Sequence, residues 1–261
     1  MNLDLTGKRA VVCGSTQGIG LASARELALL GASITLVARN ESRLQEVRES
    51  LDRTHGQEHD YLVTDFASPE QVRDRITAYL AEHRAEILVN NTGGPSPGPA
   101  LEAKPEEYIA AFNAHLICNQ VLVQALVPQM MKAGYGRIIN IISTSVKIPI
   151  RGLGVSNTIR GAVANWSKTL SVELAPYNIT VNNVLPGASM TGRLRSLMES
   201  KALKAKKSVE EIQKEMEAEI PACRISDPSE VAAAVAFLAS PAAAYINGVN
   251  LPVDGGRTGS L

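Results

Sequence analysis

Short runs of apolar residues alternate along the chain with segments in which apolar side chains recur every three or four positions. The short runs are typical of buried β-strands, and the periodic segments are typical of amphipathic helices. The predicted strands are 10–13, 33–37, 61–63, 87–91, 137–142, 179–184 and 248–253. The predicted helices are 21–30, 42–52, 69–82, about 105–133, about 155–175 and 228–240. Apolar strands separated by helices indicate a parallel sheet that is covered on both faces.

The pattern therefore predicts an α/β fold with a doubly wound parallel sheet of about seven strands, in one domain over 1–261. One segment departs from the alternation: 192–220 is rich in lysine and glutamate, and we expect a helical insertion there. Ser208 and Glu211 have the spacing of a capping box inside this insertion. Its lysines are interpreted as a solvated face, with a docking surface for an acidic or phosphate-bearing partner as the alternative: Lys201, Lys204, Lys206 and Lys207.

The first predicted strand runs directly into a glycine-rich turn, in which Gly14, Gly18 and Gly20 enclose Ser15 and Ile19. Glycines let the backbone turn tightly and approach a ligand closely. The helix that follows directs its free N–H groups and the positive end of its dipole at the turn. A pyrophosphate fits that arrangement. An ordinary strand-to-helix turn is the alternative, but the strand before and the helix after favour nucleotide binding.

Composition narrows the class of protein. Of the 261 residues 45% are hydrophobic, which is enough for one domain with a full core. The 26 basic and 26 acidic side chains cancel, so nothing points to a nucleic-acid or membrane partner. No run approaches the roughly 18 apolar residues of a membrane-spanning helix, and we expect no leader because the chain does not open with a basic-then-apolar segment. The three widely spaced cysteines do not form a metal or disulfide framework, so we expect a soluble cytoplasmic protein without a metal.

Several motifs occur in an order that resembles the short-chain dehydrogenase/reductase family over nearly the whole chain. They are Gly14-x-x-x-Gly18-Ile19-Gly20, Asn90-Asn91-Thr92-Gly93, Ser143, Pro186-Gly187 with Thr191, Ile220-Pro221, and Pro252-Val253-Asp254-Gly255-Gly256. The chain most resembles the subgroup of 3-oxoacyl-(acyl carrier protein) reductases. This resemblance implies a Rossmann-like, NAD(P)-binding fold with seven strands, a small carbonyl or alcohol substrate, and a homotetramer.

The resemblance also implies which side chains surround the cofactor. Asn91 and Gly93 would line the adenosine ribose, and Asp65 would meet the adenine, although helix capping is a rival role for Asp65. Residues after the sixth strand would hold the nicotinamide. Besides the glycine turn, the candidate cofactor-binding residues are Arg39, Asp65, Phe66, Asn91, Gly93, Arg160, Pro186, Gly187 and Thr191.

The end of the second strand favours NADP over NAD. A carboxylate at that position would accept the ribose hydroxyls and reject a 2′-phosphate. This chain has Ala38 there, followed by Arg39. Alanine removes the repulsion, and a guanidinium can bind a phosphate at two points. A solvated cation at the end of the strand is the alternative for Arg39.

The catalytic positions depart from the family pattern, which has a serine, a tyrosine thirteen residues later and a lysine four beyond that. Counted from Ser143, the tyrosine position is Ser156 and the lysine position is Arg160. The upstream asparagine position of the family falls on His115. Of the family's catalytic residues, only the serine is present.

The substitution of the tyrosine weakens the proton donor. A phenol has a pKa of ~10, whereas an aliphatic alcohol is nearer to the ~15.7 of water. The difference is roughly 8 kcal/mol of acidity, an upper bound on the handicap of Ser156 as an acid. Arginine keeps the positive charge but does not release a proton. We therefore interpret Ser156 as a hydrogen-bonding or packing residue.

Two hypotheses follow. In the first, the protein is an NADP-dependent reductase of a ketone or 3-oxoacyl thioester with a rearranged proton path. His115, with an unperturbed pKa of ~6.5, would deliver a proton through water while Ser143 and Arg160 hold the developing oxyanion. A buried structural histidine is the alternative for His115. In the second hypothesis, the fold binds a dinucleotide without turnover, as a sensor or scaffold. The intact cofactor motifs favour the first.

Overall fold

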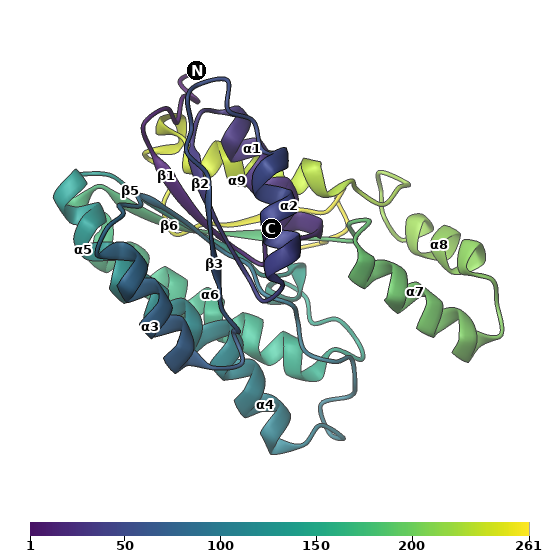
Figure 1. Cartoon of the computed structure of the whole chain (residues 1–261). Helices are drawn as coiled ribbons and strands as arrows, with labels where there is room; N and C mark the ends of the chain where they lie inside the picture. Colours follow the sequence, from purple (N-terminus) through teal and green to yellow (C-terminus); the bar gives the residue numbers. More distant parts are fainter. Residues whose placement is uncertain (261) are drawn as a thin grey trace.

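A computed structural model describes residues 1–260 and is built around a seven-stranded parallel sheet (Figure 1). The strand order is β3-β2-β1-β4-β5-β6-β7, and each neighbouring pair is parallel. The predicted α/β class and doubly wound sheet are confirmed. The strands are β1 Arg9–Cys13, β2 Ser33–Ala38, β3 Asp60–Val63, β4 Ile87–Asn90, β5 Gly136–Ile141, β6 Ile179–Pro186 and β7 Asn250–Val253.

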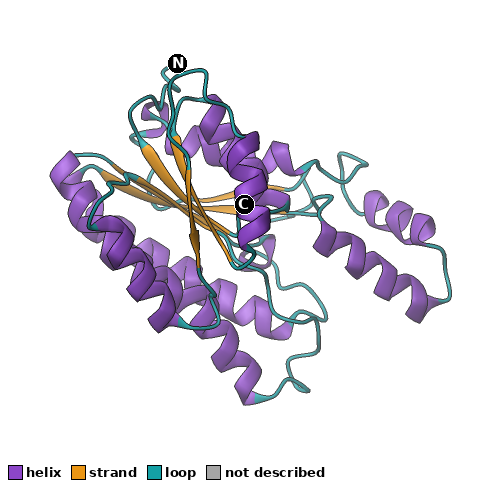
Figure 2. Cartoon of the chain, viewed as in Figure 1, coloured by secondary structure: helices purple, strands orange, loops and turns teal. Residues whose placement is uncertain are grey.

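Helices cover both faces of this sheet (Figure 2). Side chains of α1, α2 and α9 pack on one face, and side chains of α3, α5 and α6 pack on the other. The helices are α1 Gly18–Leu29, α2 Glu41–Ser50, α3 Pro69–Leu80, α4 Pro105–Phe112, α5 Cys118–Ala133, α6 Gly154–Leu174, α7 Gly192–Ala205, α8 Val209–Ala218 and α9 Pro228–Ala239. Successive strand residues supply the two cores in turn: Val12 faces the α1 side and Val11 faces the α3 side.

The helix predicted over about 105–133 contains an interruption. Between α4 and α5 lies one π-helical turn, Asn113–Ile117, so the helical run is continuous but changes its register at His115. By length and composition this run, Pro105–Ala133, could cross a membrane. The expectation that no stretch approaches spanning length is therefore wrong. In this fold, however, buried residues of α5 such as Leu122 and Leu126 pack into the core on the α3 side of the sheet.

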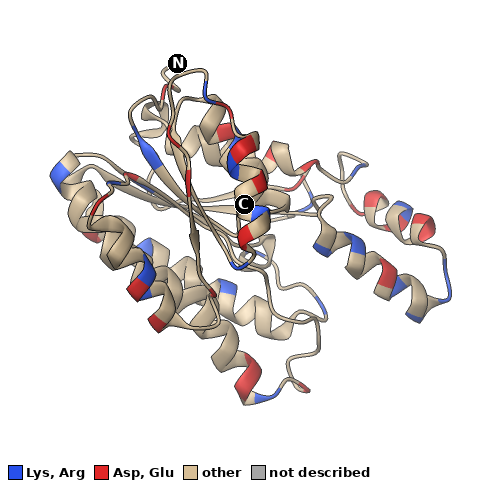
Figure 3. Cartoon of the chain, in the orientation of Figure 1, with Lys and Arg blue, Asp and Glu red and all other residues tan. Residues whose placement is uncertain are grey.

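The insertion at 192–220 forms a pair of helices, α7 and α8, which extend away from the sheet (Figure 1). The two helices pack on each other through a small cluster of their own, and the predicted capping box at Ser208 opens α8. Basic residues outnumber acidic ones in α7, and acidic residues outnumber basic ones in α8 (Figure 3). The four lysines singled out above are all exposed, as a solvated face requires.

A row of asparagines crosses the second half of the sheet at one register position, Asn90, Asn140, Asn183 and Asn250. Each side-chain amide donates to the next asparagine along the row, over 2.8, 3.0 and 2.8 Å. The row ties strands β4 to β7 together. Asn90 ends β4 and Asn140 is the second-last residue of β5, so this part of the row lies at the edge where a doubly wound sheet binds its ligand.

Candidate functional site

The turn between β1 and α1 accepts only glycine at its key positions. Gly14 and Gly18 have positive φ angles of 60° and 56°. Gly20 has an ordinary helical backbone, but a Cβ there would lie 2.2 Å from the carbonyl oxygen of Gly14 and 2.6 Å from Nδ2 of Asn91. Chain segments thus meet at Gly20 without room for a methyl group. This close packing folds the turn back over the start of α1.

The start of α1 has no side-chain cap. Its N-cap residue, Gln17, makes no capping hydrogen bond, and the first turn contains no acidic residue. By contrast, α2, α3, α7, α8 and α9 each begin with a side chain that accepts a backbone N–H. The first N–H groups of α1 are therefore left to bind an anion from outside the chain.

Two further residues of the turn, Ser15 and Ile19, hold it in place. Ser15 is fully buried, and its hydroxyl accepts a hydrogen bond of 3.0 Å from the backbone N–H of Val37 in β2. Ile19 is half-buried and packs against the core on the α1 side. The side chains of both residues therefore point into the protein, and only their backbone groups are available to a ligand.

Asn91 lies at the switch point of the sheet, where β1 and β4 are neighbours and the strand order reverses. Its side-chain amide donates to the carbonyl oxygens of Cys13 (3.2 Å) and Gly14 (3.4 Å). Gly93, two residues later, is exposed, and a Cβ there would meet nothing within 4 Å. Asn91 thus joins the end of β4 to the glycine turn at the edge where such sheets bind ligands.

Arg39 and Asp65 face each other at the ends of β2 and β3. Their side chains approach to 3.9 Å, and 75% of the Arg39 side chain is exposed. Asp65 accepts the backbone N–H of Ala67, but Ser68 is the residue that caps α3. Helix capping therefore does not account for Asp65. Phe66 packs against the core on the α3 side, beside these two charges.

The loop after β6 reaches back to the glycine turn. Thr191 caps α7 by accepting the N–H of Leu194 at 3.2 Å. A Cβ placed on Gly18 would lie 3.1 Å from the methyl group of Thr191, so the two residues are close together. Pro186 ends β6, and Gly187 follows it with its Cα packed tightly against Asp254. The fold thus brings Pro186, Gly187 and Thr191 to the same edge as the turn.

Ser143 and Ser156 lie beyond the carboxyl end of β5. Ser143 follows β5 and is half-buried, and its hydroxyl accepts the N–H of Ser145 at 3.0 Å. Ser156 is in the first turn of α6, half-buried, and makes no side-chain hydrogen bond with any residue of the described range 1–260. A free hydroxyl at this position can bond to a ligand.

Arg160 lies one turn further along α6 and is 8% exposed. Its Nη1 donates to the carbonyl oxygen of Ile141 at 3.2 Å. Within residues 1–260, no carboxylate lies within ion-pair distance of its guanidinium. Burial, together with the charge of Arg193, lowers the pKa of Arg160 to about 10, so the guanidinium stays protonated at neutral pH.

His115 is at the centre of the π-helical turn and is 2% exposed. Its Nδ1 is hydrogen-bonded to the hydroxyl of Thr92. Burial lowers the pKa of His115 to about 3, and the charges of Arg160 and Arg193 add to the effect. The imidazole is therefore neutral at physiological pH, and the unperturbed pKa assumed from the sequence is wrong because the side chain is buried beside two cations.

Arg193 is a site residue that the sequence interpretation missed. It extends from the first turn of α7 to the loop after β4, where its Nη1 donates to the carbonyl oxygen of Gly94 at 2.5 Å and its Nη2 to that of Pro95 at 2.8 Å. The two segments are almost a hundred positions apart, and no local motif connects them. Only the tertiary fold places this charge near Arg160 and His115.

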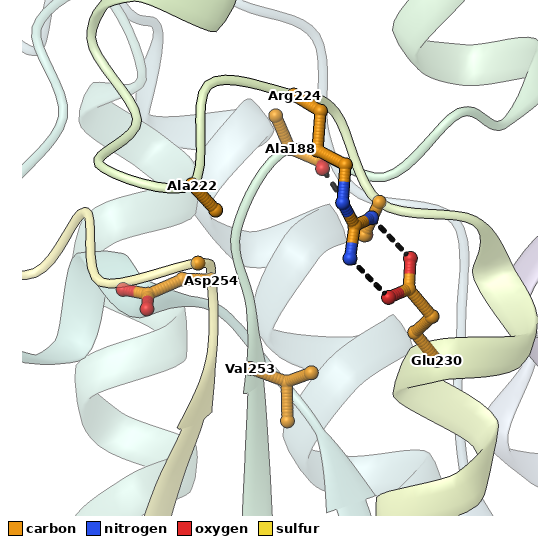
Figure 4. Close-up of a pocket in the computed structure, with 8 residues that line it drawn as sticks. Ala188, Ala222, Arg224, Glu230, Val253 and Asp254 are labelled. Carbon is orange, nitrogen blue, oxygen red and sulfur yellow. Dashed lines mark hydrogen bonds and ion pairs between the residues drawn. The ribbon is translucent and has the colours of Figure 1, made fainter.

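A small cavity of about 150 Å³ lies beside the same edge, between the β6 loop and β7 (Figure 4). The charged side chains that line this cavity are paired with one another. Both Nη atoms of Arg224 donate to the carboxylate of Glu230, at 2.7 and 2.6 Å. Asp254 accepts backbone N–H groups of Gly256 and Thr258. These residues stabilise the loop behind Gly187 and offer no free charge to a ligand.

Comparison with known proteins agrees with this geometry. A family profile described as "Enoyl-(Acyl carrier protein) reductase" matches residues 14–258. The chain belongs to the short-chain dehydrogenase/reductase family. Within this family, the chain is 35% identical over 254 residues to a 3-oxoacyl-(acyl-carrier-protein) reductase of Escherichia coli. The alignment covers 97% of this chain and 98% of the relative.

Two further members of the short-chain dehydrogenase/reductase family are similar over their whole length. The NADPH-dependent reductase BacG of Bacillus subtilis is 30% identical over 259 residues, covering 98% of this chain and all of the relative. The L-sorbose reductase of Gluconobacter frateurii, solved with NADPH and L-sorbose, superposes with a TM-score of 0.94 at 32% identity, covering both chains completely.

Proposed function

We propose that this chain is an NADP-dependent reductase of a small carbonyl compound. NADPH, when bound, supplies a hydride to the carbonyl carbon. The observation that carries the proposal is the uncapped start of α1 beneath a turn that only glycine can form. The exposed Arg39, in a position to bind a 2′-phosphate, favours NADP over NAD. The sorbose reductase and an actinorhodin polyketide ketoreductase, both solved with NADPH, have the same fold.

The proposed cofactor contacts follow the edge of the sheet. Backbone groups of the glycine turn would bind the pyrophosphate, Arg39 the 2′-phosphate, Asp65 and Phe66 the adenine, and Asn91 with Gly93 the adenosine ribose. Arg160 would hold the nicotinamide ribose. The full set is Gly14, Ser15, Gly18, Ile19, Gly20, Arg39, Asp65, Phe66, Asn91, Gly93, Arg160, Pro186, Gly187 and Thr191.

On the substrate side, the Ser143 hydroxyl and the Arg160 guanidinium would stabilise the negative charge that develops on the carbonyl oxygen. Ser156 would hydrogen-bond to the substrate without acting as the acid. His115 is neutral, so it does not store a proton. A neutral imidazole can still relay one, accepting a proton on one nitrogen and releasing it from the other. We propose that His115, oriented by Thr92, relays a proton from water.

A second candidate function is dinucleotide binding without turnover, as in a sensor or a scaffold subunit. The specific observation in its favour is that neither Ser156, Arg160 nor the neutral His115 is a strong proton donor at neutral pH. The cofactor side of the molecule would be the same in both cases.

Turnover separates the two candidates. The purified protein is mixed with NADPH and a panel of ketones and β-ketoacyl thioesters, and loss of the nicotinamide absorbance is followed. The reductase predicts oxidation of NADPH with at least one carbonyl compound; binding of NADPH with no oxidation across the panel favours the second candidate. The variant His115→Ala is expected to lose turnover with unchanged NADPH affinity, whereas the exposed His55→Ala control keeps both. Unchanged turnover in His115→Ala would remove His115 from the proton path.

The homotetramer implied by the resemblance and the cytoplasmic location expected from the composition stay predictions. Size-exclusion chromatography with light scattering tests the first, and cell fractionation tests the second.

A further inference from the structure

Two arginines on the proposed substrate side, Arg160 and Arg193, act electrostatically on the same buried histidine, His115. Arg160 comes from α6 and Arg193 from the start of α7, and each guanidinium is close enough to lower the pKa of His115. Within residues 1–260, neither arginine forms an ion pair with a carboxylate. By contrast, Arg224 and Arg257 form ion pairs with carboxylates, and both of these pairs are at the surface.

Arg160 is the less satisfied of the two. A guanidinium has five N–H donors, and the hydrogen bond to the Ile141 carbonyl uses one of them. At 8% exposure, bulk water reaches little of this side chain. Buried charges in proteins are as a rule paired, because an unpaired charge loses its hydration without compensation. Within residues 1–260, the fold thus supplies no carboxylate partner for this buried cation.

Arg193 is held in place by backbone. Its bonds to the carbonyl oxygens of Gly94 and Pro95 use two of its five N–H donors and fix the plane of the guanidinium. A Cβ on Gly94 would lie 2.9 Å from Nη2 of Arg193, so the absence of a side chain there lets the guanidinium lie against the loop. Three N–H donors of Arg193 remain free, on a side chain that is already positioned.

Among the residues that the structure describes, no carboxylate forms an ion pair with either the buried Arg160 or the exposed Arg193. His115 is neutral at physiological pH. Like charges repel each other, and an anion bound beside them reduces that repulsion and is attracted by both. A carboxylate is the group whose planar geometry matches a guanidinium at two points.

We propose that the carbonyl substrate carries a carboxylate, and that Arg193, supported by Arg160, binds it. The substrate class is then an oxo acid, in preference to a neutral ketone or a thioester. Arg193 is in this view a specificity-determining residue. The statement about the substrate rests on the proposed reductase function, but the binding of a carboxylate at Arg193 does not require turnover.

The test uses malonate, a dicarboxylate that this chemistry does not reduce, and malonamide, its neutral isostere. Both are titrated by calorimetry into the full-length protein saturated with NADP⁺. We expect saturable malonate binding that is at least tenfold weaker in Arg193→Gln and partly restored in Arg193→Lys. Malonamide should bind weakly to all of them. Arg195→Gln is the matched control, because Arg195 is an exposed arginine on the same helix with no ion pair in the described range; it should stay within twofold of the wild type.

Equal malonate affinity in the wild type and Arg193→Gln, or no saturable malonate binding in the wild type, overturns the proposal. The proposal is also contradicted if Arg193→Gln loses NADP⁺ affinity and malonate affinity by the same factor. Arg193 would then only hold α7 in place. Failure of the reductase function is recognised separately, as absence of NADPH oxidation. If the protein bound no NADP⁺ at all, the same malonate titration on the protein alone still decides the anion site.

Discussion

The two halves of the site are built on different principles. At the end of β1 the proposed ligand contacts are backbone groups, and the glycines that expose them cannot be replaced without steric conflict. Beyond β5 the proposed contacts are side chains: Ser143, Ser156 and Arg160, with His115 added from the π-helical turn. From the sequence we expect the first half to keep the family's motifs and the second half to keep only the serine. Where backbone groups bind the ligand, the geometry of the turn restricts which residues are allowed. Where side chains bind it, a single substitution can change the chemistry of the site.

We expect the cofactor half to bind NADPH although the substrate half has no side chain at the position of the family's usual acid that could replace it. If so, restoring the acid should change the rate and leave binding alone. A substitution that displaces the glycine turn should instead abolish NADPH binding, whichever residues are present at positions 156 and 160.

The largest effect is expected from the double variant Ser156→Tyr with Arg160→Lys. It restores the phenol and the lysine of the family pattern, and a positioned general acid contributes typically ~10²–10⁴-fold to a rate. Turnover of NADPH with the best carbonyl substrate should rise toward that range, with NADPH affinity within about threefold. The single variant Ser156→Phe, which adds the ring without the hydroxyl, is the control and should show no gain. A double variant no faster than the wild type would mean that the acid is not what the site lacks.

A loss of comparable size is expected from Gly20→Ala. The added methyl would lie 2.2 Å from the Gly14 carbonyl oxygen and would displace the turn, so NADPH affinity should fall at least about 100-fold, or ~2.7 kcal/mol. Fluorescence titration of NADPH measures the affinity, and the thermal unfolding midpoint shows whether the fold survives. Gly259→Ala, where a Cβ meets nothing within 4 Å, is the matched control. Wild-type affinity in a folded Gly20→Ala protein would show that the turn does not hold the cofactor.

A smaller effect concerns stability as a function of pH. The pKa of His115 is about 3 in the folded protein, against ~6.5 when unfolded, so between these values the unfolded state binds more protons. The free energy of unfolding should therefore fall as the pH drops below about 6.5, by about 2 kcal/mol between pH 8 and pH 5 from this group. Urea unfolding at both pH values measures it. His115→Asn should lose that share of the pH dependence and His55→Asn should keep it; an unchanged slope in His115→Asn would contradict a buried neutral imidazole.

Much of the cofactor half could be predicted from the sequence because its signals are local. The glycines, the strand before them and the helix after them run over 21 consecutive positions, from Arg9 to Leu29, and the capping box at Ser208 is equally local. The π-helical turn at His115 has no comparable signal. Beside it, α4 and α6 pack on each other through Ala111, Val155 and Ile159, residues that are distant in sequence.

The electrostatics of the substrate half could not be predicted because they depend on burial and on distant segments. The sequence places His115 on a helix, but only the fold shows that the ring is buried next to two guanidiniums. Arg193 belongs to a stretch whose charges resemble an ordinary solvated face. Its bonds to Gly94 and Pro95 join segments that no motif connects.

The central claim is that dinucleotide phosphates bind to the free N–H groups at the start of α1. The most direct measurement is an equilibrium titration of the purified protein with NADPH and with NADH. The account predicts saturable binding of both, with NADPH about tenfold tighter, or ~1.4 kcal/mol, and with that preference lost in Arg39→Ala. No saturable binding of either dinucleotide to the folded protein would contradict the claim.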